Sequence, residues 1–171
     1  MSITQATVTD VPALNKLVNS AYRGETSKQG WTTEANLLDG LRIDEETMTG
    51  YFSDPNIIIL KHTDDAEEIT GCVYLELRAP KLYVGMFSVS PVLQGKGVGR
   101  ALLEAAESYA KQLHCTTLTM TVISIRTELI AWYQRRGYLP TGATEPYPTD
   151  HELGRPLHEN LHFIVMEKPI L

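Results

Sequence analysis

Residues 89–103, VSPVLQGKGVGRALL, join two stretches that have different periods and thereby predict the fold class. Residues 82–89 before the turn have the composition of a β-strand, whereas apolar residues from 98 to 113 recur at the 3.6-residue spacing of a helix. Glycine permits positive φ and a close approach of the backbone to a ligand, and the first N–H groups of a helix attract anions. The segment therefore predicts a strand-to-helix turn that binds a phosphate group, with three glycines in it: Gly95, Gly97 and Gly99.

Two common nucleotide-binding patterns do not fit this turn. A Walker loop needs G-x-x-x-x-G-K-[ST], which the sequence lacks. A dinucleotide fingerprint needs a third glycine where Arg100 stands, and a carboxylate about 20 residues further on, where Thr119 and Met120 stand. A nucleotide-binding oxidoreductase is therefore the weakest interpretation. A plain connecting turn is the other alternative. Lys96 and Arg100 add positive charge to the turn, and for each side chain the alternative is a solvated surface charge.

The composition predicts one folded domain, residues 1–171, with 43% hydrophobic residues. The net charge of −6 argues against nucleic acid as a partner. The charge is uneven, because residues 94–136 carry six Lys/Arg against three Asp/Glu, whereas residues 1–93 carry seven against thirteen and residues 137–171 two against five. A basic island containing the glycine turn thus lies within an acidic chain.

Other features of the composition exclude several classes of protein. The first residues lack the basic and apolar regions of a signal peptide, and the longest aliphatic run, 57–60, is far shorter than a membrane span. Cys72 and Cys115 have no paired spacing and no nearby histidine pair, so neither a zinc site nor a disulfide framework is indicated. We expect a cytoplasmic protein with no metal and no membrane partner.

The order of periodic segments predicts an α/β protein of the mixed-sheet (α+β) kind. A helix follows Asp10, and its apolar face carries Leu14, Leu17, Val18 and Tyr22. A second helix, capped by Thr32 or Thr33, carries Leu37, Leu38 and Leu41, and a helical turn lies near 47–52. Further helices are predicted over 98–113 and 127–136. A long loop spans 145–160, and loops of this length in compact domains are often functional. The expected strands are 3–8, 56–62, 71–78, 82–89, 116–122, 138–144 and 162–168.

Two spaced motifs resemble those of one family. Residues 94–99, QGKGVG, resemble the Q/R-x-x-G-x-G/A signature of the GNAT superfamily of acyl-CoA N-acyltransferases, and residues 89–91 match that family's V-x-P. Residues 129–138, LIAWYQRRGY, resemble its A-x-x-F-Y-x-x-x-G-F segment. The order of elements agrees across nearly the whole chain. More narrowly, GWTTE near the start and ELIAWY.R.GY near the end resemble a widespread, uncharacterised subset of the family.

The resemblance implies a splayed, mostly antiparallel sheet of about seven strands, flanked by about four helices. The sheet would open between residues 82–89 and 116–122, and the cosubstrate acetyl-CoA would enter that cleft. Backbone N–H groups of residues 95–100 would hold its pyrophosphate, while main-chain groups of Phe87 and Val89 would pair with its pantetheine arm. Ser124 and Arg126 are further candidates for contact with the cosubstrate. The predicted cofactor-binding residues are Phe87, Val89, Gln94, Gly95, Lys96, Gly97, Val98, Gly99, Arg100, Ser124 and Arg126.

Acetyl transfer to an amine needs a neutral amine, stabilisation of the carbonyl oxyanion and a proton for the departing thiolate. Tyr133 matches the family tyrosine near the CoA sulfur and is the predicted catalytic acid; the alternative is a core aromatic residue. The family often has an acid four positions before Val89, where this chain has Gly85. Glu76 and Glu34 are the remaining candidates for the general base, with a water-relayed route also open.

A second departure from the family lies seven residues before the tyrosine. The family commonly has an asparagine there, and this chain has Arg126. Ser124 is a candidate to replace the hydrogen bond of that asparagine. Arg126 itself either reaches a CoA phosphate or caps the start of the helix.

The resemblance points to residues 24–41 and 145–160 as walls of the acceptor pocket. Both lie in acidic portions of the chain, which favours a cationic amine. The resemblance thus implies an acetyl-CoA-dependent N-acetyltransferase acting on a primary amine of a small molecule or peptide, with a homodimer as a candidate assembly. The alternative, which Gly85 keeps open, is a catalytically degenerate acyl-CoA-binding sensor. The predicted acceptor-binding residues are Trp31, Thr32, Glu34 and Tyr147.

Overall fold

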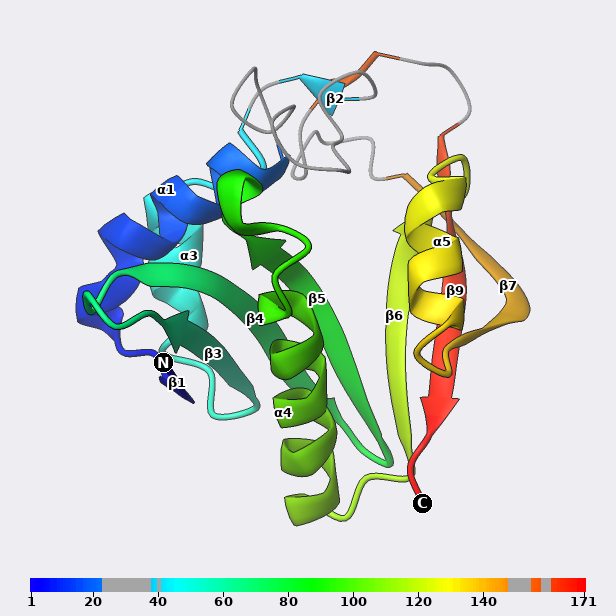
Figure 1. Cartoon of the computed structure of the whole chain (residues 1–171). Helices are drawn as coiled ribbons and strands as arrows, with labels where there is room; N and C mark the ends of the chain where they lie inside the picture. Colours follow the sequence, from blue (N-terminus) through cyan, green and yellow to red (C-terminus); the bar gives the residue numbers. More distant parts are fainter. Residues whose placement is uncertain (23–37, 40, 148–154, 158–160) are drawn as a thin grey trace.

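A seven-stranded mixed sheet forms the centre of the molecule in the computed structural model (Figure 1). The structure describes residues 1–22, 38–39, 41–147, 155–157 and 161–171. The strands lie in the order β1-β3-β4-β5-β6-β9-β7, and every neighbouring pair is antiparallel except β5 and β6. Their bounds are β1 Ser2–Gln5, β3 Ile57–Thr63, β4 Ile69–Arg78, β5 Lys81–Val89, β6 Thr117–Ile123, β7 Leu139–Pro146 and β9 His162–Pro169.

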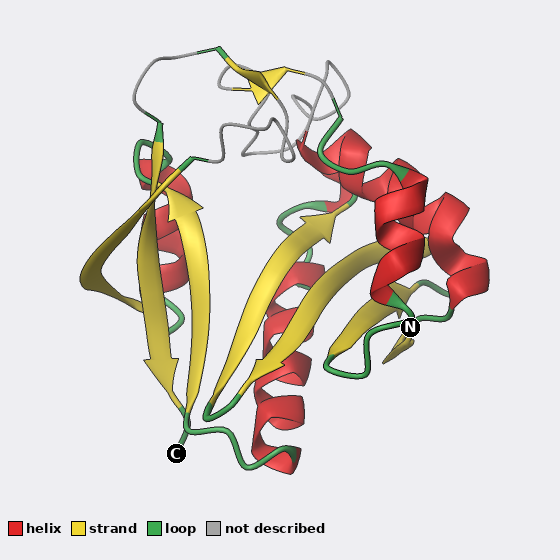
Figure 2. Cartoon of the chain, turned by 180° about the vertical axis from the view of Figure 1, so that it is seen from behind, coloured by secondary structure: helices red, strands yellow, loops and turns green. Residues whose placement is uncertain are grey.

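Helices cover both faces of this sheet (Figures 1 and 2). On one face, α1 packs over β4 and β5 around Leu14 and Val18, with α3 beside it; on the other, α4 packs on the same strands through Leu102 and Ala106. These apolar residues recur at helical spacing, which explains why the segments fold as helices against the sheet. The described α-helices are α1 Val11–Tyr22, α3 Glu45–Tyr51, α4 Val98–Gln112 and α5 Thr127–Gln134, and short 3-10 turns span Val8–Asp10 and Pro91–Leu93.

The sheet splays open between β5 and β6. The two strands pair only through Lys81 with Thr117, Leu82 with Leu118 and Tyr83 with Thr119, and they then diverge (Figure 2). The predicted splay and the mixed, mostly antiparallel sheet are therefore confirmed. A strand edge without a partner strand exposes its N–H and C=O groups. The second half of β5 therefore offers backbone hydrogen-bonding groups to the opening between β5 and β6.

A β-bulge in β5 turns the chain at this opening. The pairing with β4 shifts between Cys72, which faces Ser88, and Tyr74, which faces Gly85, and Met86 has φ of +47°. An extra residue in one strand bends that strand and re-aims its side chains. The Phe87 ring, next along the chain, lies among the aromatic residues of α5, so the bulge sits where the cleft begins.

One predicted helix is wrong in its second half. Leu38 and Asp39 form the short strand β2 (Leu38–Asp39), which pairs with β8 (Arg155–Pro156), and Leu41 is not helical. The leucine spacing indicated a helix, but pairing with a distant segment overrides a short apolar pattern. The start of that helix, with its proposed caps, lies outside the described residues. Within the described part of the chain, no helix is long and apolar enough to cross a membrane.

Candidate active site

The glycine turn has the backbone conformation that the sequence predicts. Gly95 has φ of +84° and Gly97, the N-cap of α4, has φ of +89°, a region that side chains with a Cβ rarely adopt. A Cβ placed on either residue would meet nothing within 4 Å, so glycine is needed for the backbone angle and not because of crowding. The first N–H groups of α4 have no partner within the helix. The turn therefore presents open space and free backbone donors at the positive end of a 15-residue helix.

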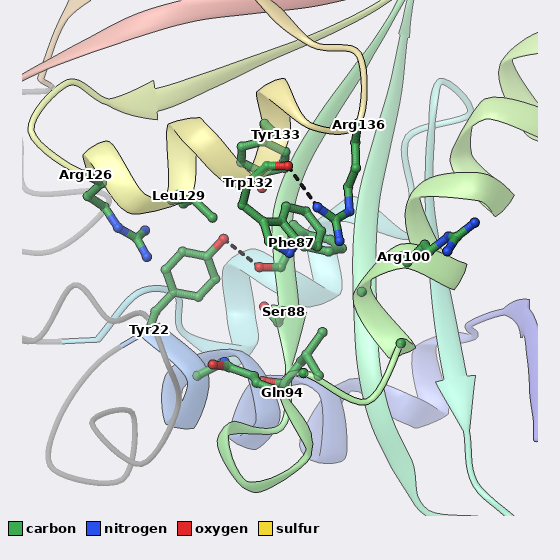
Figure 3. A pocket seen from close by; sticks show the side chains of 15 residues that line it. Tyr22, Phe87, Ser88, Gln94, Arg100, Arg126, Leu129, Trp132, Tyr133 and Arg136 are labelled. Atoms are coloured by element: carbon green, nitrogen blue, oxygen red, sulfur yellow. Dashed lines mark hydrogen bonds between the residues drawn. The ribbon is translucent and has the colours of Figure 1, made fainter.

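A cavity of about 250 Å³, the first cavity, connects this turn to the splay (Figure 3). It is lined by the glycines of the turn, by Phe87 and Val89 of β5, and by Trp132 and Tyr133 of α5. A second cavity of about 220 Å³ lies alongside it. The lining residues common to both cavities are Tyr22, Phe87, Arg126, Leu129 and Tyr133.

Tyr133 lies at the junction of the two cavities. Its residue is only 5% exposed, and its ring contacts those of Phe87, Trp132 and Tyr138 at centroid distances of 6.2, 5.3 and 5.8 Å. The ring packs in the aromatic core, as the alternative interpretation expects, and it also borders both cavities.

Tyr22, at the end of α1, fixes the bulged strand. Its hydroxyl donates a hydrogen bond of 2.8 Å to the carbonyl oxygen of Phe87 (Figure 3). The guanidinium of Arg42 lies 5.4 Å from the Tyr22 ring. A carbonyl oxygen has two lone pairs, so Phe87 remains able to accept a second hydrogen bond from a ligand. The sequence assigned Tyr22 only to the apolar face of a helix, because no local pattern shows a partner 65 residues away.

The side chains of the predicted phosphate turn have different placements. Gln94 reaches back to the carbonyl oxygen of Val89 at 3.2 Å, and Lys96 is exposed. Arg100 lines the first cavity, but its side chain is 73% exposed and is paired with Glu104 at 2.9 Å. Val98 is buried in the core. The turn thus offers a ligand mainly its backbone.

The two residues near the position of the family asparagine, Ser124 and Arg126, differ in their relation to the cavities. The Ser124 hydroxyl lies 3.4 Å from Nδ1 of His162 and is not among the groups that line the two cavities. Arg126 is only 6% exposed and borders both. Of the two residues, only Arg126 is therefore placed to meet a ligand.

The absence of an acid at Gly85 has a structural reason. A Cβ at this position would lie 2.7 Å from Cε1 of Tyr83, whose ring occupies the space of a side chain. Glu76 is also engaged elsewhere, because it accepts hydrogen bonds from the Tyr74 hydroxyl and from Nε of Arg78 at 3.1 Å. The hydrogen bond from Arg78 holds the pKa of Glu76 below its usual value. This carboxylate borders neither cavity, and both facts weigh against a role as general base.

The acceptor side is described only in part, since Trp31, Thr32 and Glu34 lie outside the described residues. Tyr147 is buried, stacks on Phe163 at 5.6 Å and lines the second cavity. Most of the charged residues that the described ranges contribute to this cavity come from outside the two predicted wall segments, 24–41 and 145–160. These charged lining residues are Arg42, Arg126 and, from within the second segment, Glu145.

No group of three or more His, Cys, Asp or Glu side chains in the portion of the chain that the structure covers could hold a metal ion. The described part of the site combines the glycine turn at the start of α4, a buried tyrosine and two adjoining cavities. This arrangement agrees with the comparison with known proteins, in which residues 16–138 match the model of the acetyltransferase (GNAT) family.

The chain belongs to the GNAT acetyltransferase family. It is 25% identical over 128 residues to the mycothiol acetyltransferase of Rhodococcus erythropolis, an alignment covering 70% of this chain and 40% of that protein. The chain spans less than half the length of this curated relative and of another that it matches.

Solved structures share the GNAT fold across the whole chain. The ribosomal-protein-S18-alanine N-acetyltransferase of Escherichia coli has a TM-score of 0.72 and 20% identity, covering 99% of this chain and 93% of that one. A phosphinothricin acetyltransferase of Sinorhizobium meliloti in complex with AcCoA has a TM-score of 0.73 and 15% identity, covering 99% and 88%. Such identities establish the fold and leave the substrate open.

Proposed function

We propose that the protein is an acetyl-CoA-dependent N-acetyltransferase that transfers an acetyl group directly to a primary amine of a small molecule or peptide. The observation that carries the proposal is that one cavity contains both the glycine turn and Tyr133. A phosphate-binding turn and a buried phenol joined by a single cavity fit a long substrate that has phosphates at one end and a reacting thioester at the other.

The residues present fit coenzyme A along this path. Left-handed Gly95 and Gly97 leave open space in front of the N–H groups at the start of α4, which suits a pyrophosphate. The edge of β5 at Phe87 and Val89 borders the same cavity and suits the amide groups of a pantetheine arm, as an added strand would. The thioester then lies near Tyr133, where the second cavity begins.

The chemistry follows from this placement. A neutral amine in the second cavity attacks the thioester carbonyl carbon, the C–S bond breaks, and the Tyr133 hydroxyl hydrogen-bonds to the departing thiolate and supplies its proton. The acceptor amine loses its proton to a carboxylate or to a water held by one. Glu145 is the carboxylate that the described residues contribute to the second cavity, and Glu34 is the other candidate base.

A second function, an acyl-CoA-binding sensor without turnover, has one specific observation in its favour. The position of the common family acid is Gly85, and the Tyr83 ring fills the space in front of it. The missing acid removes the usual base and leaves the cofactor end of the cleft intact. Binding and turnover must therefore be measured separately.

The test is thiol release from acetyl-CoA in the presence of a panel of amines, with acetylated product identified by mass. The panel contains amino acids, polyamines, amino sugars and peptides with free N-termini. The proposal predicts amine-dependent thiol release and a product heavier by one acetyl group. Binding of acetyl-CoA with no turnover across the panel supports the sensor instead, and no binding of acetyl-CoA overturns both functions.

A further inference from the structure

Arg136, just after α5, holds its guanidinium in an unusual position. The guanidinium carbon lies 3.6 Å from the centroid of the Trp132 ring, and Nη1 donates a hydrogen bond of 2.9 Å to the Trp132 carbonyl oxygen. Figure 3 shows the group turned in toward Phe87 and Trp132. Two contacts with one residue four positions earlier therefore fix its orientation before any ligand arrives.

The charge of Arg136 is not balanced by a carboxylate of the described chain. Two basic residues that line a cavity with it are both paired: Arg100 with Glu104 at 2.9 Å, and Lys168 with Glu107 at 2.8 Å. Among the residues that the structure covers, Arg136 makes no ion pair, and its Nε is buried without a hydrogen-bond partner.

Two other cationic side chains act on the Arg136 guanidinium. Burial, followed by the charges of Arg135 and Arg100, lowers the pKa of the Arg136 guanidinium. A partly buried cation beside two like charges is unfavourable unless an anion neutralises it. Fixed orientation together with an unbalanced charge is the arrangement expected of a binding group for an anion.

Arg136 also stands next to the phosphate turn. A Cβ on Gly99 would lie 3.6 Å from the Trp132 ring, so the ring on which the Arg136 guanidinium stacks packs directly against the start of α4. Arg136 lines the first cavity, and it also lines a third cavity beside α4, which Arg100 and Arg135 border. The two carboxylates of that third cavity, Glu104 and Glu107, are the ones already paired.

We propose that Arg136 binds the 3′-phosphate of the adenosine moiety of coenzyme A and makes the protein discriminate against the 3′-dephospho form. The proposal rests on the proposed use of acetyl-CoA. Backbone N–H groups of the turn bind the pyrophosphate. The Arg136 guanidinium, which borders both the first and the third cavity, is then available to bind the 3′-phosphate. A phosphomonoester carries up to two negative charges and suits a planar guanidinium.

The experiment is calorimetric titration of the whole chain with CoA and with 3′-dephospho-CoA. The variants are Arg136→Gln, Arg136→Lys and, as a matched control, Lys111→Gln, which removes a positive charge on α4 from a residue that lines none of the three cavities. Circular dichroism and the melting temperature of each variant without ligand establish that it is folded.

We expect wild type and Lys111→Gln to bind CoA about ten- to a hundredfold more tightly than dephospho-CoA, the range for a lost hydrogen-bonded charge pair. Arg136→Gln abolishes this ratio and leaves the affinity for dephospho-CoA unchanged, and Arg136→Lys keeps only part of it because the planar geometry is lost. Equal weakening of both ligands in Arg136→Gln overturns the proposal, since it indicates a contact with the pyrophosphate, the adenine or the fold. A wild type that binds both equally also overturns it, whereas a wild type that binds neither refutes the use of CoA itself.

Discussion

Replacing Gly97 by alanine separates the backbone requirement of the turn from its role in binding. Gly97 has φ of +89° with nothing within 4 Å of a built Cβ, so the folding penalty comes from the left-handed backbone alone. That penalty is about 1–2 kcal/mol, which lowers Tm by about 2–8 °C in a chain of this length. Gly142 in β7 is a matched control, with φ of +90° and equally open surroundings, and it lines none of the three cavities.

We expect both variants to lose a similar amount of stability but only Gly97→Ala to lose affinity for acetyl-CoA. A methyl group at 97 displaces a phosphate from N–H groups whose charge-assisted hydrogen bonds contribute about 1.5–3 kcal/mol each, so Kd rises about tenfold or more. Differential scanning fluorimetry gives Tm and calorimetric titration gives Kd. If Gly97→Ala binds acetyl-CoA as tightly as Gly142→Ala does, the turn does not hold the phosphates.

Three further substitutions test the rest of the site. Tyr133→Phe keeps the ring contacts, so we expect unchanged affinity for acetyl-CoA and a kcat lower by about tenfold or more, measured as thiol release; an unchanged kcat removes the acid role. Tyr22→Phe loses the 2.8 Å hydrogen bond to Phe87, and we expect about 1 kcal/mol less stability and a higher KM for acetyl-CoA; an unchanged KM would show that this bond does not position β5. Glu76→Gln should keep kcat within about twofold and lose under about 1 kcal/mol of stability. The pKa of Glu76 is lower in the folded chain than in the unfolded chain, so wild type is more stable than Glu76→Gln above the unfolded pKa of about 4.3. This difference in unfolding free energy disappears as pH falls through the folded pKa. A large fall in kcat in Glu76→Gln would restore Glu76 as a base.

Much of the fold was predictable because its signals are local. The period change at residues 89–103 predicted β5, the glycine turn and α4, and the motif at 129–138 predicted α5 with Tyr133. Leu38 shows the limit of such reasoning, because three leucines at helical spacing do not reveal a β-bridge to Pro156 in a distant loop. Periodicity predicts which segments are regular, and long-range pairing decides the exceptions.

The site was less predictable than the fold, because its contacts join residues that are far apart in the sequence. Tyr22 looked like one more apolar position of a helix, and only the folded chain places its hydroxyl on Phe87. Arg136 stood in a basic stretch where any arginine is usually solvated; its stacking on Trp132 and its unbalanced charge are tertiary facts. The absence of an acid at Gly85 was visible in the sequence, whereas the Tyr83 ring that fills its space was not.

We propose that acetyl-CoA binds with its phosphates on the backbone at the start of α4 and its pantetheine arm along β5. Hydrogen–deuterium exchange of the whole chain with and without acetyl-CoA tests it most directly. We predict slower exchange at residues 97–100 and at 87–89, where the first N–H groups of α4 and the open edge of β5 border the first cavity. Protection confined to other parts of the chain, with these amides unchanged, would contradict the account.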